Sequence, residues 1–384
     1  MNEKGYRYTL GDKELKNRFK KYVKRHVFSG HKPSQGKPVL ALVGAQPAAG
    51  KTKAANALAA RHPDMVVLIG DELRQYHPDY TRAMRENPEI MPEVTAQASG
   101  KWIGMSVEHA REKGYNLLLE GTFRNTEMVV GNADEFANRK WGGYTVEVSA
   151  LAVNADRSLL DSVGRYLYSG EGRWTSVAAH DEAYEGVPET LKALEKSLSI
   201  SRAVVTDRSG KDLYVNERDS NGDWTRPPKA AKFLERHRNL PFSQEEAREW
   251  INDYWSHASE MIRRNELNPV TAPTFLKLHD SADIIFQQAH PGDKEALKVH
   301  QSHQALQKIV FLAGKNGADN SKLPLSPNKF FNATEARKSE FLGEFRKAKK
   351  GPKRQGSTRA ASLLPDQIRT RPRKQRPRDV EPEL

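Results

Sequence analysis

The stretch Val39–Thr52, VLALVGAQPAAGKT, decides the fold that this sequence predicts. Its first residues form an apolar run that stops at Gly44, and Gly50-Lys51-Thr52 opens an Ala-rich segment with good helix propensity. Strand, small-residue loop, Gly-Lys-Thr and helix is the order of a phosphate-binding P-loop. This order favours a nucleotide site over a plain strand-to-helix turn.

The chemistry of this loop predicts a site for nucleotide phosphates and Mg²⁺. Backbone N–H groups and the helix N-terminus carry partial positive charge where phosphates would lie, Lys51 adds a full charge, and the Thr52 hydroxyl can ligate Mg²⁺. The usual pattern begins with glycine where this chain has Ala45, and an alanine fits there if its φ is negative. The residues predicted to form this nucleotide site are Gly44, Ala45, Gln46, Pro47, Ala48, Ala49, Gly50, Lys51 and Thr52.

The composition predicts a soluble protein whose positive charge is concentrated at one end. The 384 residues carry a net charge of +13, a mean hydropathy of −0.77 and no cysteine, which excludes disulfides and thiolate metal sites. With no apolar run of about 18 residues and no signal-peptide pattern, we expect a cytoplasmic location. Residues 346–384 hold thirteen Lys/Arg and four acids, so +9 of the +13 lies there.

Alternating apolar runs and helical patterns predict an α/β fold with a parallel sheet covered by helices on both faces. The predicted strands are 38–44, 65–70, 115–121 and 144–153, and the predicted helices between them are 52–61, 93–113 and 125–140. Sheets of this kind bind ligands at the C-terminal ends of their strands. Polar clusters follow the first three predicted strands, so we expect them to converge on one crevice.

The sequence divides into five regions. Residues 1–37 predict a basic amphipathic helix that packs on the core, with a nucleic-acid-binding helix as the alternative. Residues 38–220 form the P-loop domain, and the polar, turn-rich interval 221–242 predicts a linker. Residues 243–345 predict a small helical appendix that opens with a capping box, and 346–384 predict a disordered basic tail.

Asp71 follows the second predicted strand and is a candidate general base. Phosphoryl transfer needs cradled phosphates, a metal, charge neutralisation at the transferred group and a base aimed at the acceptor hydroxyl. Asp71 is placed for the last of these roles. In the alternative interpretation its carboxylate orders Mg²⁺ or the waters around the metal.

Five further residues can complete a transfer site. Arg165 and Arg173 are flanked by glycines, so a mobile flap could bring them over the transferred phosphate; they could equally be ordinary surface arginines. Glu120, Thr122 and Arg124 offer an acceptor, a hydroxyl and a cation at the third strand end. These three suit a polar acceptor that carries phosphate or sugar, and a structural salt bridge is the alternative.

Four motifs follow one another in this chain: GAQPAAGKT at 44–52, GDELRQYHP at 70–78, GYNLLLEGTFR at 114–124, and Arg165-Tyr followed by Arg173 and Ala-His-Asp at 179–181. Together they resemble the zeta toxins, the kinase half of bacterial epsilon/zeta toxin–antitoxin pairs. Members of that family read G-Q-P-x-x-G-K-T, D-x-F-[RK]-x-x-H-P and G-Y-N-L-[VI]-[IL]-E-G-T-x-R at these places. The resemblance covers roughly residues 8–220.

The resemblance implies a P-loop kinase fold and an activity. The best-known family activity is ATP-dependent phosphorylation of UDP-N-acetylglucosamine on the sugar 3′-hydroxyl, which stops growth until a separate antitoxin blocks the ATP site. By the same resemblance, Lys51 and Thr52 would hold ATP and Mg²⁺, and Asp71 would be the base. Arg165 and Arg173 would stabilise the transferred charge, and the acceptor site would be lined by Glu120, Thr122 and Arg124.

One position departs from the family pattern. Family members that use UDP-N-acetylglucosamine carry a glutamate on the helix before Glu-Gly-Thr, and that position is Gly104 here, with Glu108 the nearest acid. The sugar is therefore open, and a kinase of another nucleotide or dinucleotide is an alternative. A non-catalytic ATP-binding switch is a further alternative from a different class.

The basic tail has three possible uses. It can tether the protein to nucleic acid or a membrane surface without sequence choice, act as a translocation signal like the Arg-rich C-termini of type IV secretion substrates, or serve only solubility. The segment lacks interleaved aromatic residues, so it predicts no base-reading chemistry.

Overall fold

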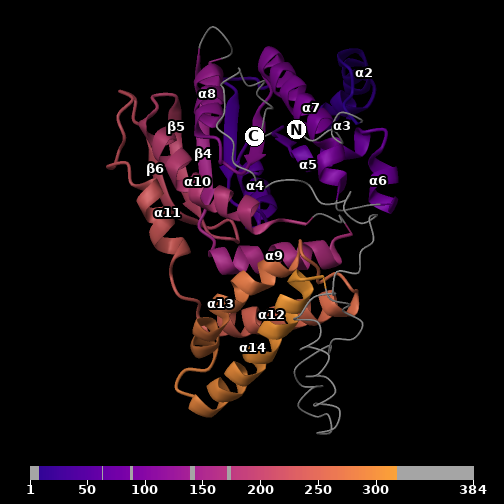
Figure 1. The fold of residues 1–384 in the computed structure, drawn as a ribbon. Coiled ribbons are helices and arrows are strands. Elements are labelled where there is room, and N and C mark those ends of the chain that lie inside the picture. Colours follow the sequence, from indigo (N-terminus) through magenta and orange to yellow (C-terminus); the bar gives the residue numbers. More distant parts are fainter. Residues whose placement is uncertain (1–7, 63, 87–89, 139–142, 171–173, 318–384) are drawn as a thin grey trace, which may run out of the picture.

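The computed structural model describes residues 8–62, 64–86, 90–138, 143–170 and 174–317, and Figure 1 shows its arrangement. A six-stranded sheet in the order β2-β3-β1-β4-β5-β6 forms the centre of the larger part. Its strands are β1 (Val39–Gly44), β2 (Val66–Leu68), β3 (Leu117–Gly121), β4 (Thr145–Leu151), β5 (Ile200–Thr206) and β6 (Asp212–Glu217).

The sheet is parallel from β2 to β5, and β6 adds an antiparallel edge. β1 lies between β3 and β4, with Leu40 opposite Leu117 on one side and Val146 on the other. All three side chains are fully buried, as expected where helices cover both faces of a sheet. The predicted fold class is therefore confirmed, with the antiparallel strand β6 as an addition at the edge.

Helices surround this sheet and continue below it (Figure 1). The N-terminal group is α2 (Asp12–Arg18), the π-helix η1 (Phe19–Val23) and α3 (Lys24–Phe28); the group around the sheet is α4 (Lys51–Ala59), α5 (Gly70–Leu73), η2 (Arg74–Tyr76), α6 (Tyr80–Glu86), α7 (Met91–Lys113), α8 (Thr126–Ala137), α9 (Ala155–Tyr168), α10 (Val177–Lys196) and α11 (Ala230–Arg238); and the C-terminal group is α12 (Gln244–Arg263), α13 (Ala272–Ala289) and α14 (Lys294–Lys315).

The N-terminal helical segment packs on α7. Leu15 and Val23 are fully buried in the main core, and the indole Nε1 of Trp102 on α7 donates to the Leu15 carbonyl at 3.1 Å. The lysines of this segment, such as Lys20 and Lys21, remain exposed. The apolar side of this basic helix is therefore used for packing.

The linker expected at 221–242 is wrong for its second half, because α11 lies there. Ala230, Ala231 and Leu234 recur at helical spacing and are buried in the main core. The carboxylate of Glu195 on α10 accepts from the Ala230 backbone N–H at 2.9 Å, which satisfies one of the free donors at the start of α11. Three small or apolar residues in a polar stretch were too weak a pattern to predict this helix.

The C-terminal helices pack on α9 of the P-loop domain rather than standing apart. Ser243 and Glu246 form the predicted capping box at the start of α12. Trp250 and Tyr254 of α12 and Phe275 of α13 share one buried cluster with Leu159 of α9. Figure 1 shows α9 between the sheet domain and α12–α14, which we call the C-terminal bundle. Residues 318–345 and the basic tail lie outside the described residues.

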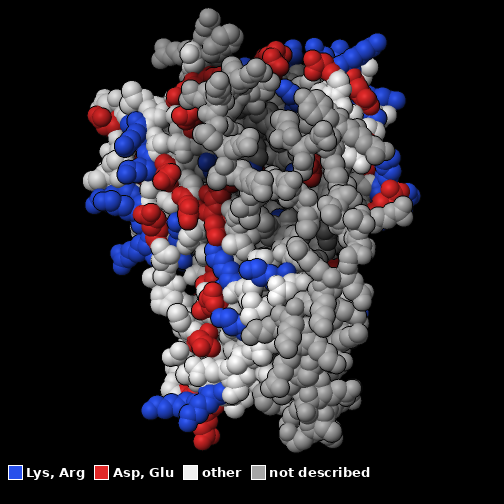
Figure 2. All heavy atoms as spheres, in the orientation of Figure 1, with Lys and Arg blue, Asp and Glu red and all other residues white. Residues whose placement is uncertain are grey.

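The surface of the described part mixes both charge signs. Figure 2 shows Lys and Arg interspersed with Asp and Glu over the described residues of the face drawn. No helix among the described residues is long and apolar enough to cross a membrane. The described residues of this face therefore form no continuous basic patch, although the whole chain has a net positive charge.

Candidate active site

A cleft lies at the C-terminal ends of β1, β2 and β3, where sheets of this class bind ligands. It is lined by the loop after β1 and the first residue of α4, by the turn through α5 into η2, by one side of α7, by the end of β3 and the segment after it, and by α9. The predicted residues that line it are Pro47, Lys51, Asp71, Glu120, Thr122, Arg124 and Arg165. The three polar strand ends thus converge as the sequence predicts.

The loop after β1 turns sharply before α4. Ala48 has φ +58° and Gly50, the residue before α4, has φ +87°, a region that glycine adopts without strain. The Lys51 ammonium donates to the carbonyls of Ala45 at 3.1 Å and Gln46 at 3.2 Å, and lies 4.0 Å from Glu120 Oε1. Lys51 is therefore held at the mouth of the loop, facing the acceptor side of the cleft.

The first glycine of this loop is Gly44, one position before the place where the usual P-loop pattern has it, and packing accounts for it. A Cβ at Gly44 would lie 2.1 Å from the Phe123 ring, so only glycine lets the ring approach β1 this closely. Ala45 is fully buried and is not among the described residues with positive φ. An alanine fits at this position because its φ is not positive, as the sequence analysis required.

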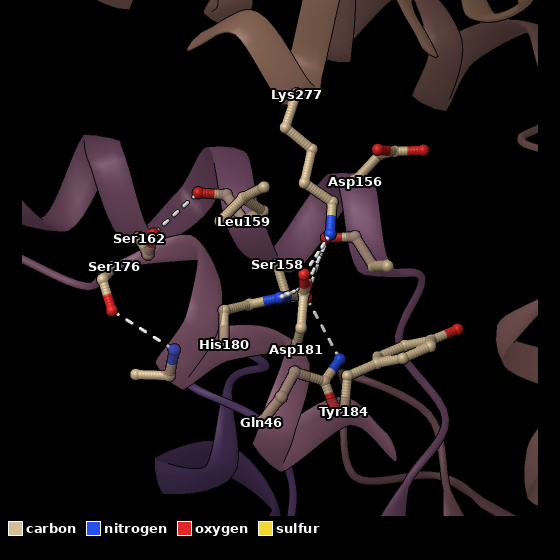
Figure 3. A network of polar contacts seen from close by, with 12 residues as sticks. Gln46, Asp156, Ser158, Leu159, Ser162, Ser176, His180, Asp181, Tyr184 and Lys277 are labelled. Carbon is tan, nitrogen blue, oxygen red and sulfur yellow. Dashed lines mark hydrogen bonds and ion pairs between the residues drawn. The ribbon is translucent and has the colours of Figure 1, made fainter. Parts of the chain in front are cut away.

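Gln46 faces away from the cleft into a polar network (Figure 3). Its side chain is 1% exposed, and its Nε2 donates to the Val153 carbonyl at 2.9 Å and to Ser158 Oγ at 3.1 Å. Ser158 Oγ lies 2.9 Å from Nε2 of His180. The loop is thereby fastened to the end of β4, to α9 and to α10.

Asp71 is held by an arginine that sequence reasoning did not single out. Arg74, one helical turn later, donates from Nε to Asp71 Oδ1 at 3.0 Å. The same guanidinium donates to the Pro92 carbonyl and to Thr95 Oγ1, both at 2.8 Å. Burial lowers the pKa of Arg74, against a smaller opposing effect of Tyr80. The spacing of three between Asp71 and Arg74 was the available signal, since it places both on one side of a helical turn.

Glu120 is the more buried of the two cleft carboxylates. Burial raises its pKa, the positive charge of Lys51 opposes this rise, Glu72 adds to it and Arg165 opposes it. Arg124 lies 3.6 Å from Glu182 of α10. The acceptor-side trio is thus assembled around the cleft, and Arg124 also contacts α10.

Close packing against α10 fixes the segment after β3. Phe123 has φ +54°, and its carbonyl accepts from Thr190 Oγ1 at 2.7 Å. A Cβ at Gly186 would lie 2.9 Å from the Arg124 Cα, so this glycine permits the contact. The orientation of Thr122 and Arg124 therefore depends on two α10 residues that lie more than sixty positions later in the chain.

The two candidate arginines of the flap have different outcomes. Arg165 of α9 lines the cleft and its guanidinium donates to Thr175 Oγ1 at 3.3 Å. Arg173 lies outside the described residues. Arg165 therefore lies in the cleft rather than on an open surface.

The α7 wall of the cleft carries a cation and no acid. Gln97, Ser99, Gly100 and Lys101 line the cleft, whereas Gly104 does not, and a Cβ at Gly104 would meet nothing within 4 Å. Lys101 is exposed to the cleft and has no hydrogen bond or ion pair among the described residues. Sequence reasoning missed Lys101, because its position on the cleft side follows from how α7 packs.

Comparison with known proteins identifies the family. The profile described as "Zeta toxin" matches residues 24–219, just over half of the chain and including every described residue of the cleft. The chain belongs to the zeta toxin family. It is 27% identical over 209 residues to Toxin zeta of Streptococcus agalactiae, covering 53% of this chain and 71% of that protein.

A further relative supports the same assignment, and a solved structure shares the fold. Toxin PezT of Streptococcus pneumoniae is 27% identical over 215 residues, or 54% of this zeta toxin family chain and 83% of the relative. A solved structure from a study of the PezAT chromosomal toxin–antitoxin system of Streptococcus pneumoniae superposes with a TM-score of 0.54 at 24% identity, covering 66% of this chain and 97% of that chain. The structural match shows the shared P-loop kinase fold.

Proposed function

We propose that this zeta toxin family member is an ATP-dependent kinase that phosphorylates a hydroxyl of a small nucleotide-type substrate, with UDP-N-acetylglucosamine as the first candidate. The observation that carries the proposal is the convergence of Lys51, Asp71, Glu120, Arg124 and Arg165 on one cleft beside a P-loop. A phosphate cradle alone would suit a binding switch. A switch has no need of two carboxylates and an acceptor-side arginine next to the loop.

Each group has a role that its position supports. Bound ATP and Mg²⁺ supply the transferable phosphoryl group and neutralise its charge. Lys51, Thr52 and the loop N–H groups would hold them, since the loop ends at a helix N-terminus that favours anions. Asp71 would accept the proton of the acceptor hydroxyl as the new O–P bond forms and ADP leaves. Arg165, with Arg173 as a second candidate, would stabilise charge on the transferred group.

The charge of the cleft favours an anionic acceptor. Among the described residues that line it, the cations are Lys51, Arg74, Lys101, Arg124 and Arg165, and the acids are Asp71 and Glu120. An acceptor with its own phosphate groups fits this excess, and a neutral sugar does not. Family members that use UDP-N-acetylglucosamine carry a sugar-binding glutamate at the position of Gly104, and this chain lacks that contact. Another nucleotide or dinucleotide is therefore the second candidate.

Replacing Lys101 with glutamine is expected to raise KM for the anionic acceptor about tenfold while kcat stays within about twofold. A hydrogen bond to a charged group contributes about 1.5 kcal/mol or more, and about 1.4 kcal/mol corresponds to a factor of ten. Steady-state kinetics at saturating ATP measures the change. Lys113→Gln, an exposed lysine at the end of the same helix, is the matched control. An unchanged KM in K101Q would remove Lys101 from acceptor binding.

The kinase proposal is tested with an unbiased substrate pool. A bacterial metabolite extract is incubated with the full-length protein, ATP and Mg²⁺ and compared by mass spectrometry with the same reaction of Asp71→Asn. We expect one nucleotide-type metabolite to gain a single phosphate only with the wild type. If no metabolite gains phosphate while ATP still binds, the switch interpretation replaces the kinase.

We also propose a separate antitoxin as partner. The solved relative comes from a toxin–antitoxin system. Possible contact of the tail with nucleic acid stays a prediction, because residues 346–384 lie outside the described part.

A further inference from the structure

The nucleotide loop is connected to the C-terminal bundle by a continuous line of polar contacts (Figure 3). Lys277 of α13 reaches down to Asp181 of α10, and its ammonium donates to the two carboxylate oxygens at 2.6 and 2.5 Å. Asp181 Oδ1 lies 3.3 Å from His180 Nδ1, and His180 Nε2 lies 2.9 Å from Ser158 Oγ. Ser158 Oγ accepts from Gln46 of the loop at 3.1 Å.

One arrangement of the hydrogen atoms satisfies every contact of this line, although the Ser158 hydroxyl also lies 3.0 Å from the Asn154 carbonyl and 3.2 Å from the Ala155 carbonyl. His180 is fully buried, and burial lowers its pKa; Asp181 raises it and Lys277 lowers it, so a neutral ring is favoured. A neutral ring beside the Asp181 carboxylate carries its proton on Nδ1 and donates there. In this arrangement Nε2 accepts a hydrogen bond from the Ser158 hydroxyl, and the Ser158 oxygen accepts from Gln46.

Lys277 lies in the part of the chain that the family profile does not match. The profile ends at residue 219, and α13 begins at Ala272. A second contact between α13 and α9 lies nearby, because Ser281 Oγ donates to Asp156 Oδ1 at 2.9 Å. Burial raises the pKa of Asp156, the hydrogen bond from Ser281 and the charge of Lys277 oppose this rise, and Asp181 adds to it. The Lys277 ammonium therefore interacts favourably with two neighbouring carboxylates.

We propose that Lys277 is a positioning residue for the nucleotide loop, acting from the C-terminal bundle through Asp181, His180 and Ser158 on the side chain of Gln46. The bundle is then part of the nucleotide site rather than an independent appendix. Gln46 also donates to the Val153 carbonyl, so the loop conformation does not depend on this line alone. The line restricts the remaining motion of the Gln46 side chain and of the loop. The effect on kinetics rests on the proposed kinase function, whereas the effect on the loop itself does not.

The test compares Lys277→Gln with the wild type in the full-length, nucleotide-free protein. Hydrogen–deuterium exchange is followed on a peptide that covers the loop, residues 44–52. We expect its protected amides to exchange about fivefold faster in K277Q, the effect of losing one typical hydrogen bond. KM for ATP is expected to rise by a similar factor with kcat within about twofold. K277R, which keeps the charge, is expected to restore both.

Two further variants separate positioning from general stability. Lys308→Gln removes a second lysine of the bundle, which is exposed, lies 3.9 Å from Asp280 and is outside this line, and it is expected to change neither readout. Ser158→Ala breaks the line next to Gln46, so adding K277Q to S158A is expected to have no further effect on the loop.

The outcomes are decisive in either direction. Unchanged loop exchange in K277Q, or additive effects of K277Q and S158A, would overturn the proposal whether or not the protein is a kinase. Equal acceleration in a sheet peptide at 117–121 would show a global loss of stability and would overturn it as well. Faster loop exchange in K277Q, together with no ATP-dependent phosphoryl transfer by the wild type, would support the positioning role of Lys277 and contradict the proposed kinase function.

Discussion

Asp71→Asn is expected to lower the rate of phosphoryl transfer by about 10²–10⁴-fold, the usual effect of losing a general base. Asp71 lines the cleft at the end of β2, and its side chain is 44% exposed there, so an acceptor hydroxyl can reach it. The fold should tolerate the change, because Arg74 keeps its bonds to the Pro92 carbonyl and to Thr95. Single-turnover transfer from ATP to the identified acceptor measures the loss.

The matched control for this change is Glu72→Gln. Glu72 is the next residue, lies 3.7 Å from His26 and does not line the cleft, so its rate should stay within about twofold. A Mg²⁺ titration distinguishes the two roles considered for Asp71. A base cannot be replaced by more metal, whereas a variant that regains its rate at high Mg²⁺ would identify Asp71 as a residue that orders the ion.

The P-loop, the existence of the first four strands and the convergence of the strand ends could be predicted because local patterns carry them. A buried parallel strand is a short apolar run, and each such run here is followed by its own polar cluster. Parallel pairing then forces those clusters to one edge. Lys51, Asp71 and Glu120 meet for this reason, without any need to know the packing of side chains.

The remaining parts of the site depend on contacts that no local pattern carries. Lys101 faces the cleft because of the rotation of α7, and Phe123 takes its unusual backbone conformation against Gly44 and Thr190. Lys277 meets Asp181 across 96 positions of sequence. The same applies to α11, whose few apolar residues gain significance only where β5, β6 and α10 offer a surface to cover.

Lys51→Met is expected to lower kcat by about 10²–10³-fold, the range found when one preorganised charge-stabilising donor is removed from a transition state. Lys51 is the cation at the loop that the transferred phosphate would meet. Its loss has a second consequence. The charge of Lys51 lowers the pKa of Glu120, so in K51M that pKa rises further and the carboxyl binds a proton more readily. Transfer kinetics from pH 5 to 8 should therefore show a larger deficit at the acidic end.

Growth provides the corresponding test in cells, because members of this family are toxins. Expression of the wild type in bacteria without an antitoxin should stop growth, and K51M should relieve the arrest. Lys53→Met, two residues along α4 and exposed, is the matched control and should remain toxic. In the transfer assay, adding Glu120→Gln to K51M should abolish the larger deficit at acidic pH, because residue 120 can then no longer bind a proton. The loss of kcat caused by K51M should remain. Arrest by K51M as complete as that by the wild type would show that toxicity does not depend on phosphoryl transfer at this loop.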